Sequence, residues 1–259
     1  MRLSVNGLVV GYGSRIVING LTAEFGEGRS IILGPNGSGK TTLLRAIAGV
    51  LKPIKGSVAL DGKPLVRGDV GYVAHSGGLD PNMTVRDNLQ FYAEVKGADN
   101  LEEVVEGLGI EGLLDSRVDS LSNGQRRIVE VAVAMLGRPK VYVFDEPTDG
   151  LDVDAAGRVR EIVKGLRGIV IYTTHIVSEA LELADKLYVM RRGEVVFQGD
   201  VSELGGVVKV MARRGRETRI VEVDAGELLD TLNRLRSEGF NILEVRNSAI
   251  DELLGGGHD

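Results

Sequence analysis

The chain has no cysteine among its 259 residues, which excludes disulfide bonds and thiolate metal sites and is compatible with a reducing cytosol. It also lacks an excess of positive charge, because its formal net charge is −6 and its pI is near 5.3. Binding to duplex nucleic acid draws most of its affinity from Lys and Arg that neutralise phosphates. We therefore expect no general nucleic-acid surface on this protein.

Long apolar runs are absent as well. No uncharged apolar stretch approaches the roughly 18 residues that are needed to span a bilayer. The most apolar helix candidate, residues 128–136, is interrupted by Glu130, and residues 1–7 lack the apolar core of a signal peptide. If the protein serves a membrane, we expect another chain to span it.

The remaining composition, 43% hydrophobic and 26% charged, is typical of a folded globular protein. The sequence contains no internal repeat. Strand-like patterns precede and follow a helical middle part, residues 84–112, in which Thr84 is the expected N-cap. Alternating helices and strands then predict a largely parallel sheet flanked by helices. The expected strands are 3–10, 15–25, 57–60, 70–74, 140–144, 168–173, 186–190 and 194–197, and the expected later helices are 124–136, 153–166 and 176–184.

A boundary is predicted at residues 204–206, followed by strands near 207–211, 219–223 and 241–245. Between the last two strands, Asp224 and Glu227 have the spacing of a capping box at the start of an amphipathic helix. Its apolar stripe consists of Leu228, Leu229, Leu232 and Leu235. We expect this stripe to pack on its own small sheet; a membrane or partner face is the alternative.

The clearest motif is a phosphate-binding loop, which follows the apolar run at residues 30–33. Glycines let backbone N–H groups converge on phosphate oxygens, the lysine supplies positive charge and the threonine hydroxyl can ligate Mg²⁺. The helix that opens at Thr42 completes the required strand–loop–helix context, which argues against a glycine-rich surface turn. The loop residues are Gly34, Pro35, Asn36, Gly37, Ser38, Gly39, Lys40 and Thr41.

A second motif is the apolar strand 141–144, which ends in two carboxylates, Asp145 and Glu146. With a triphosphate in the loop, Asp145 would hold Mg²⁺ and Glu146 would orient and deprotonate the attacking water. An acidic pair at a strand end is common by itself. The two motifs together predict ATP and Mg²⁺ as cofactors.

The chain contains three further motifs: Leu-Ser-Asn-Gly-Gln at 121–125, before the carboxylate strand, Glu-Pro-Thr-Asp-Gly-Leu-Asp at 146–152 and Thr-Thr-His at 173–175. With the phosphate loop and the carboxylate strand, this series resembles the ATP-binding-cassette (ABC) transporter family over roughly residues 2–204. The segments 71–79, 83–89 and 91–93 look most like the ATPase subunits of two-component exporters of the multidrug type.

The resemblance implies an α/β fold of the P-loop NTPase class. A mostly parallel sheet with flanking helices is expected, together with an N-terminal antiparallel β subdomain and a helical subdomain at about 77–138. The ATPase domain would occupy residues 1–204, and residues 207–259 would form a small α+β accessory domain.

The resemblance also implies roles for single residues. Tyr12 matches the aromatic residue that stacks on adenine, although an exposed strand-end tyrosine is the alternative. Ser122, Gly124 and Gln125 match the signature that contacts the γ-phosphate held by the opposite subunit. Asp152 would communicate across that interface, and His175 would contact the γ-phosphate and hold the water with Glu146.

Two positions depart from the family pattern. His75 stands where the family usually has a glutamine that completes the Mg²⁺ shell, so His75 is either a substitute metal ligand or a spectator. Asn123 replaces a more usual glycine, a milder change because asparagine tolerates left-handed backbone geometry.

The sequence therefore predicts a cytoplasmic ATPase, peripheral on the inner face of the cell membrane. It would dimerise head to tail around two MgATP, as a homodimer or with a second ABC subunit, and drive an integral membrane permease, in the export direction. Two alternatives remain open: a superfamily ATPase that acts on ribosomes or DNA, and a nucleotide-sensing module that does not hydrolyse ATP.

Overall fold

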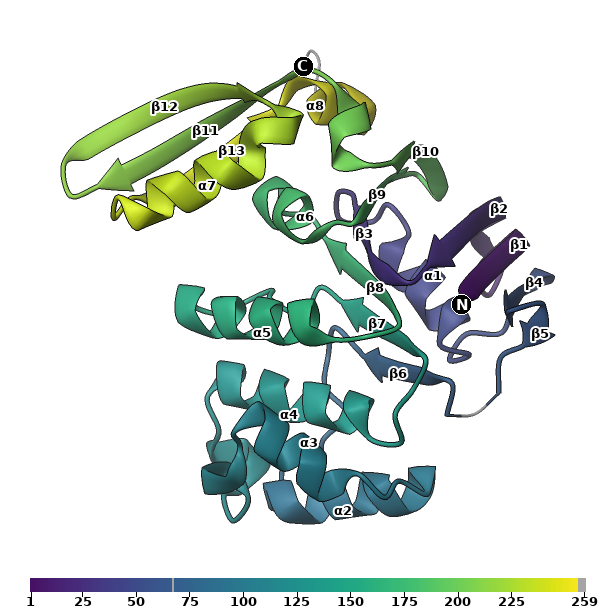
Figure 1. The fold of residues 1–259 in the computed structure, drawn as a ribbon. Helices are drawn as coiled ribbons and strands as arrows, with labels where there is room; N and C mark the ends of the chain where they lie inside the picture. The colour runs from purple at the N-terminus through teal and green to yellow at the C-terminus, as the bar shows by residue number, and fades with distance from the viewer. Residues whose placement is uncertain (67, 256–259) are drawn as a thin grey trace.

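A computed structural model describes residues 1–66 and 68–255 and confirms the predicted α/β fold (Figure 1). Its centre is a six-stranded sheet of order β10-β9-β3-β8-β7-β6, in which β3, β6, β7, β8 and β9 run parallel and β10 pairs antiparallel with β9. The strands of this sheet are β3 (Gly28–Leu33), β6 (Val70–Val73), β7 (Val141–Asp145), β8 (Ile169–Thr174), β9 (Lys186–Arg191) and β10 (Glu194–Gly199).

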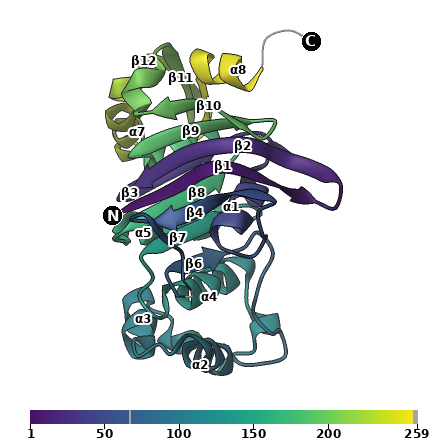
Figure 2. The ribbon, with the colours of Figure 1, turned by 90° about the vertical axis from the view of Figure 1, so that its right-hand side faces the viewer.

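Two antiparallel sheets accompany it. The first has the order β2-β1-β4-β5 and comprises β1 (Arg2–Tyr12), β2 (Arg15–Gly26), β4 (Lys55–Leu60) and β5 (Lys63–Pro64). The second has the order β12-β11-β13 and comprises β11 (Val207–Arg214), β12 (Glu217–Asp224) and β13 (Asn241–Asn247). Figure 2 shows β1 and β2 in front of the central sheet, with the second antiparallel sheet at one end and helices at the other.

The α-helices are α1 (Lys40–Ile47), α2 (Val85–Lys96), α3 (Leu101–Leu108), α4 (Asn123–Met135), α5 (Val153–Gly165), α6 (Val177–Leu183), α7 (Leu228–Ser237) and α8 (Ser248–Leu254). The helical pattern expected at 84–112 is divided between α2 and α3 by a turn at Gly97, which has a φ of 62°. Thr84 caps α2 as predicted, in a capping box with Asp87. In the part of the chain that the structure describes, no helix is long and apolar enough to cross a membrane.

The central sheet separates two apolar cores. In β7, Tyr142 and Phe144 face the helices α2 to α6, whereas Val141 and Val143 face α1 and the first antiparallel sheet. This alternation follows from the two-residue period of a strand. Because both faces are covered, β7 is buried along its whole length, and its last residue, Asp145, is buried with it.

Helix α7 packs on the sheet of β11, β12 and β13, as expected. Leu228, Leu232 and Leu235 are buried with residues of β11 and β13, in a cluster continuous with the helix-side core. The side chain of Leu229, the fourth leucine of the predicted stripe, lies outside the described residues. The division into domains at residues 204–207 stays a prediction.

The predicted capping box at Asp224 is wrong. Asp224 precedes a short 3-10 turn, Ala225–Glu227, and its side chain makes no capping hydrogen bond. Because this turn displaces the start of α7 to Leu228, Asp224 and Glu227 do not occupy the N-cap and N3 positions of that helix. Helix α8 and the short strand β5 were not predicted.

Lys96 offers a test of packing in the helical layer. Its Nζ donates to the carbonyl oxygens of Val133, at 2.5 Å, and Leu136, at 3.5 Å, near the end of α4. Burial lowers the pKa of Lys96 to about 8. Between this value and its ordinary pKa of 10.5, the unfolded chain binds a proton that the folded chain does not, so stability rises with pH in that window.

We expect the free energy of unfolding to rise by about 1 kcal/mol between pH 7.5 and 9.5, after allowance for partial solvent exposure. Urea unfolding at both pH values measures this change. Lys96→Met should lack this contribution. The two proteins share all other titrating groups, so the difference between their pH dependences reports Lys96. The same pH dependence in both proteins would contradict the assignment.

Candidate nucleotide site

The phosphate loop connects β3 to α1, as the sequence predicted. Its first residue donates from Gly34 N to the carbonyl of Thr174, at 3.2 Å, which joins the loop to the end of β8. A Cβ on Gly34 would lie 2.3 Å from the carbonyl oxygen of Met190, so only glycine fits there. Gly39, the N-cap of α1, has a φ of 106°, a conformation that side chains rarely adopt.

Lys40 begins α1 and is almost fully buried, with 4% of its surface exposed. Its Nζ donates to the carbonyl oxygens of Gly34, at 2.7 Å, and Pro35, at 3.2 Å, and lies 2.9 Å from Glu146 Oε1. The lysine therefore lies folded against its own loop and the carboxylate. A positive charge in this position is available to an anionic group that enters the loop.

Asp145 and Thr41 meet beneath the loop. Thr41 Oγ1 donates to Asp145 Oδ1 at 3.0 Å, and Thr173 Oγ1 lies 3.2 Å from the same oxygen. Burial raises the pKa of Asp145, and its other oxygen, Oδ2, has no hydrogen-bond partner among the described residues. A buried carboxylate oxygen needs a partner. An unpaired carboxylate oxygen beside a hydroxyl fits Mg²⁺, which prefers oxygen ligands.

Glu146 follows β7 in a left-handed conformation with a φ of 47°, a strained geometry for a residue other than glycine. Its N–H donates to Thr173 Oγ1 at 3.0 Å, and its Oε2 lies 2.8 Å from His175 Nδ1. Burial would raise the pKa of Glu146, but Lys40 and then His175 offset this effect, and the pKa is lowered. The carboxylate is therefore held ionised between two side chains.

Part of the loop, with Lys40, Thr41 and Glu146, lines one cavity of about 460 Å³, whereas Asp145 is buried behind Thr41 and does not line it. Predicted residues that line it are Tyr12, Asn36, Gly37, Gly39, Lys40, Thr41, Thr42, His75 and Glu146, joined by Arg15, Val17 and Asp149, which were not predicted. Tyr12 is 44% exposed, and its hydroxyl accepts from Arg45 at 3.1 Å. Of the other predicted residues, Gly34, Pro35 and Ser38 are part of the loop but do not line the cavity, and His175 contacts Glu146, which lines it.

The signature residues do not line this cavity. Ser122 caps α4 in a capping box with Gln125 and is exposed. Gly124 is buried: a Cβ there would lie 2.5 Å from that of Ala155. Asp152 caps α5 by accepting from Ala155 N at 2.8 Å. Within one chain, these four residues thus form helix starts apart from the phosphate loop.

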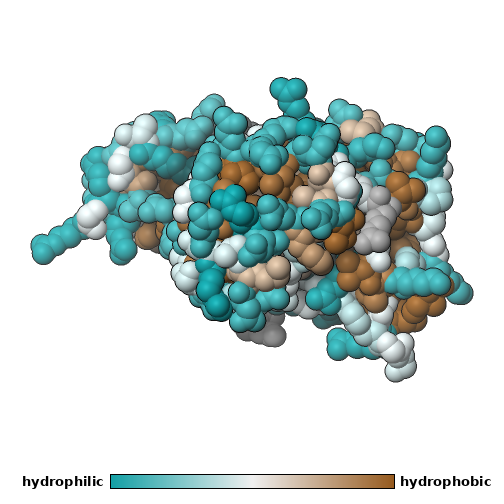
Figure 3. All heavy atoms as spheres, turned by 90° about the horizontal axis from the view of Figure 1, so that it is seen from below, coloured by the Kyte–Doolittle hydropathy of each residue, from teal (hydrophilic) through white to brown (hydrophobic). Residues whose placement is uncertain are grey.

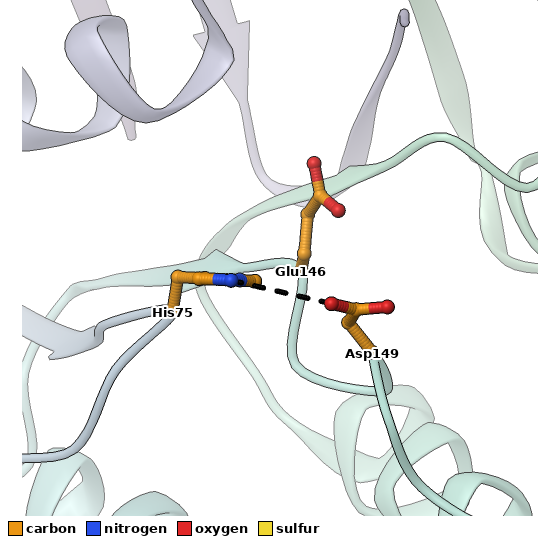
Figure 4. A group of neighbouring side chains, drawn as sticks. All are labelled: His75, Glu146 and Asp149. Carbon is orange, nitrogen blue, oxygen red and sulfur yellow. Dashed lines mark ion pairs between the residues drawn. The ribbon is translucent and has the colours of Figure 1, made fainter. Parts of the chain in front are cut away.

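His75 follows β6, and its side chain is half exposed. Its Nε2 lies 4.0 Å from Asp149 Oδ2, as Figure 4 shows. Arg127 of α4 donates to the backbone carbonyls of Ala74, at 2.8 Å, and His75, at 3.3 Å. The position of His75 is therefore tied to the helix that Ser122 caps.

Sequence reasoning missed a buried connection through Glu179 of α6. Its carboxylate accepts from Thr148 at 2.8 Å and from Thr174 at 2.6 Å, and Thr174 in turn accepts from Ile176 N at 3.0 Å. Glu179 thereby joins the turn after Glu146 to the turn that holds His175. The only signal in the sequence was a glutamate four residues after His175.

A phosphate loop between β3 and α1, beside a strand that ends at Asp145 and is followed by Glu146, defines a nucleotide-binding protein of the P-loop class. The family model described as "ABC transporter" matches residues 18–149, about half of the chain. The chain belongs to the ABC transporter family.

Three curated relatives illustrate the match. The sulfoquinovosyl glycerol transport ATP-binding protein SmoE of Agrobacterium fabrum is 34% identical over 78% of this chain and 61% of its own length. The Nod factor export ATP-binding protein I of Ralstonia nicotianae is 37% identical over 78% and 68%. The uncharacterized ABC transporter ATP-binding protein YdbJ of Bacillus subtilis is 33% identical over 97% and 85%. This chain thus spans about three fifths of the length of SmoE.

Among solved structures, cbiO1 from Clostridium perfringens, described as part of the ABC transporter complex cbiONQ, has a TM-score of 0.67 and 29% identity. The match covers 78% of this chain and 89% of that one. The central sheet and its flanking helices therefore have the fold of an ABC ATPase domain.

Proposed function

We propose that this chain is the ATP-binding and ATP-hydrolysing subunit of an ABC transporter. One observation carries the proposal: residues of the phosphate loop, Thr41 and Glu146 line a single cavity, and behind it Thr41 is hydrogen-bonded to Asp145 and Glu146 to His175. Transfer of a phosphoryl group to water needs positioning and charge neutralisation more than covalent chemistry. The cavity supplies both.

In the proposed complex, the loop N–H groups, the start of α1 and Lys40 bind the phosphates, and the exposed ring of Tyr12 stacks on the base. Thr41 and Asp145 would hold Mg²⁺. His75 is a candidate metal ligand as well, but its imidazole nitrogen suits a softer ion better than Mg²⁺. When bound, Mg²⁺ neutralises charge on the phosphates.

Lys40 connects binding to the state of Glu146. Both carboxylate oxygens of Glu146 are engaged in this structure, Oε1 by Lys40 and Oε2 by His175. A triphosphate in the loop attracts Lys40 and withdraws it from Glu146. The pKa of Glu146 then rises, because burial is less opposed, and Oε1 becomes free to accept a proton from water. His175 orients that carboxylate and the water.

We further propose that two copies close head to tail around two nucleotides, so that Ser122, Gly124 and Gln125 of one copy face the phosphates bound by the other. The exposure of Ser122 at the start of a 13-residue helix, outside the cavity of its own chain, supports this assembly. Asp152 would lie at the same interface. Pairing with a second ABC subunit would use the same surfaces.

Mixing two inactive variants tests this arrangement. Ser122→Asp keeps a good N-cap but places a negative charge toward the phosphate, and Lys40→Ala removes the phosphate-binding cation. Each variant alone should release little phosphate. A mixed dimer has one intact composite site, so an equal mixture should recover up to about a quarter of the wild-type rate. No recovery, with mixed dimers shown by cross-linking, would contradict the head-to-tail assembly.

The membrane partner is proposed to dock on the helical layer, in the cleft between residues 77–112 and the sheet. On α2, Phe91 and Val95 are 53% and 46% exposed and lie one helical turn apart. Figure 3, which views this side of the molecule, shows apolar residues gathered at the surface among hydrophilic ones. Such a surface suits a partner chain, which would place the protein on the cytoplasmic face of the membrane.

Export is the proposed direction, supported by the exporter-like segments at 71–93; the names of the relatives include both import and export proteins and do not decide it. Transport into or out of membrane vesicles that contain the partner decides it. We also propose residues 1–204, with a helical part at about 77–138, as the ATPase domain, and 207–259 as an accessory domain.

Assays of phosphate release and of co-purification separate this function from the two alternatives. A nucleotide sensor would bind ATP without steady-state phosphate release. An ATPase of ribosomes or DNA would release phosphate but would not co-purify with a multi-span membrane protein.

A further inference from the structure

We propose that His75, Asp149 and Glu146 form a binding site for a divalent transition-metal ion, such as Zn²⁺, at the mouth of the nucleotide cavity. This ligand set is distinct from the Thr41–Asp145 pair that fits Mg²⁺. Binding of the ion does not depend on the proposed ATPase activity, whereas its inhibitory effect, described below, rests on that function.

Topology brings the three side chains together. His75 follows β6, and Glu146 and Asp149 follow β7; these two strands are parallel neighbours, so their carboxyl ends meet at one edge of the sheet. One ligand atom from each side chain lies within 4.8 Å of the other two. Figure 4 shows the imidazole directed toward Asp149, with Glu146 next to them and its carboxylate directed away from the pair, so the Glu146 side chain would have to turn toward the ion.

These separations suit a metal ion. Ligand bonds of about 2.0–2.2 Å place the donor atoms of one ion about 3–4 Å apart, so the cluster needs a contraction of only about 1 Å. The side chains of His75 and Asp149 are 50% and 46% exposed and can move by this amount. Their exposure also leaves room for water at the remaining coordination positions.

The donor types select the class of ion. One imidazole and two carboxylates suit Zn²⁺ and similar ions, whereas Mg²⁺ prefers oxygen ligands alone. Lys40 and His175 already contact Glu146, but a carboxylate has about four lone-pair positions, so these contacts leave capacity for a metal bond. Asp149 adds a negative charge that favours a cation, whereas the charge of Glu146 is shared with Lys40.

A bound ion would act on the reaction through Glu146. Coordination withdraws electron density from this carboxylate and lowers its basicity, which opposes its proposed role as general base. Zn²⁺ should therefore inhibit hydrolysis by the wild-type protein.

Binding is tested with the nucleotide-free full chain and Zn²⁺ alone, by isothermal titration calorimetry after chelator treatment. The chain has three histidines, which makes the comparison clean. We expect one tight site in wild type, and His75→Gln and Asp149→Asn should each weaken it at least about tenfold. His258→Gln, outside the described residues, is the matched control and should bind as wild type does.

Two results would overturn the proposal: His75→Gln that binds Zn²⁺ as tightly as wild type, or loss of the tight site in His258→Gln. The effect on catalysis is measured separately, at constant MgATP. His75→Gln should require at least about tenfold more Zn²⁺ for half-inhibition. If Zn²⁺ binds as predicted but no protein releases phosphate, the metal site stands and the proposed ATPase function fails.

Discussion

Glu146→Gln should abolish steady-state ATP hydrolysis while ATP binding stays close to that of wild type. Glutamine keeps the size of the side chain and an oxygen that can accept from Lys40, but it cannot accept a proton from water. Loss of a general base lowers the rate by about 10²–10⁴-fold. A phosphate-release assay measures the rate, and calorimetry with MgATP measures the affinity.

Because ATP would bind but not turn over, the Glu146→Gln protein should also accumulate as an ATP-bound dimer on size-exclusion chromatography. Glu161→Gln is the matched control, since Glu161 is an exposed glutamate on α5 that pairs with Lys164, and it should hydrolyse ATP normally. Hydrolysis by Glu146→Gln at near the wild-type rate would refute the assignment of the base.

Lys40→Ala should lower the affinity for ATP by about a hundredfold, because the loss of a buried charged donor to phosphate costs about 2–3 kcal/mol. The lysine is 4% exposed, so its charge is little screened by solvent. Calorimetric titration with MgATP measures the change. Lys63→Ala, which alters an exposed lysine on β5, should bind ATP as wild type does.

Lys40→Ala also removes the cation that faces Glu146, so its thermal unfolding is compared with that of wild type to show that the protein is folded. Undiminished ATP affinity in a folded Lys40→Ala protein would count against the role of the phosphate loop. Reduced affinity in Lys63→Ala as well would show that the effect is not specific to the loop.

Motifs made of neighbouring residues were predictable. The phosphate loop, the end of β7 and the cap at Thr84 depend on backbone groups within a few residues, and the structure has them where the sequence placed them. The capping box at Asp224 shows the limit of such reasoning. Asp224 and Glu227 have the three-residue spacing of a capping box. The 3-10 turn at 225–227 displaces the helix start, however, and the spacing alone could not reveal that turn.

Contacts between distant segments were not predictable in the same way. Thr173 lies between Asp145 and Glu146 because β8 is the neighbour of β7, and Glu179 joins two turns because α6 packs behind them. The requirement for glycine at 124 comes from Ala155, on another helix. The proximity of His75 to Asp149 follows from the pairing of β6 with β7.

The sequence by itself determined the class of protein and most of the candidate site, since its loop, strand-end acids and helix starts are short-range patterns with a chemical purpose. Only the tertiary structure decided which of these side chains meet, that Lys40 and His175 hold Glu146, and that His75 lies beside two carboxylates. The physical reason is the order of the strands in the sheet. Strands that are far apart in the chain pair side by side, so the residues at their ends become neighbours.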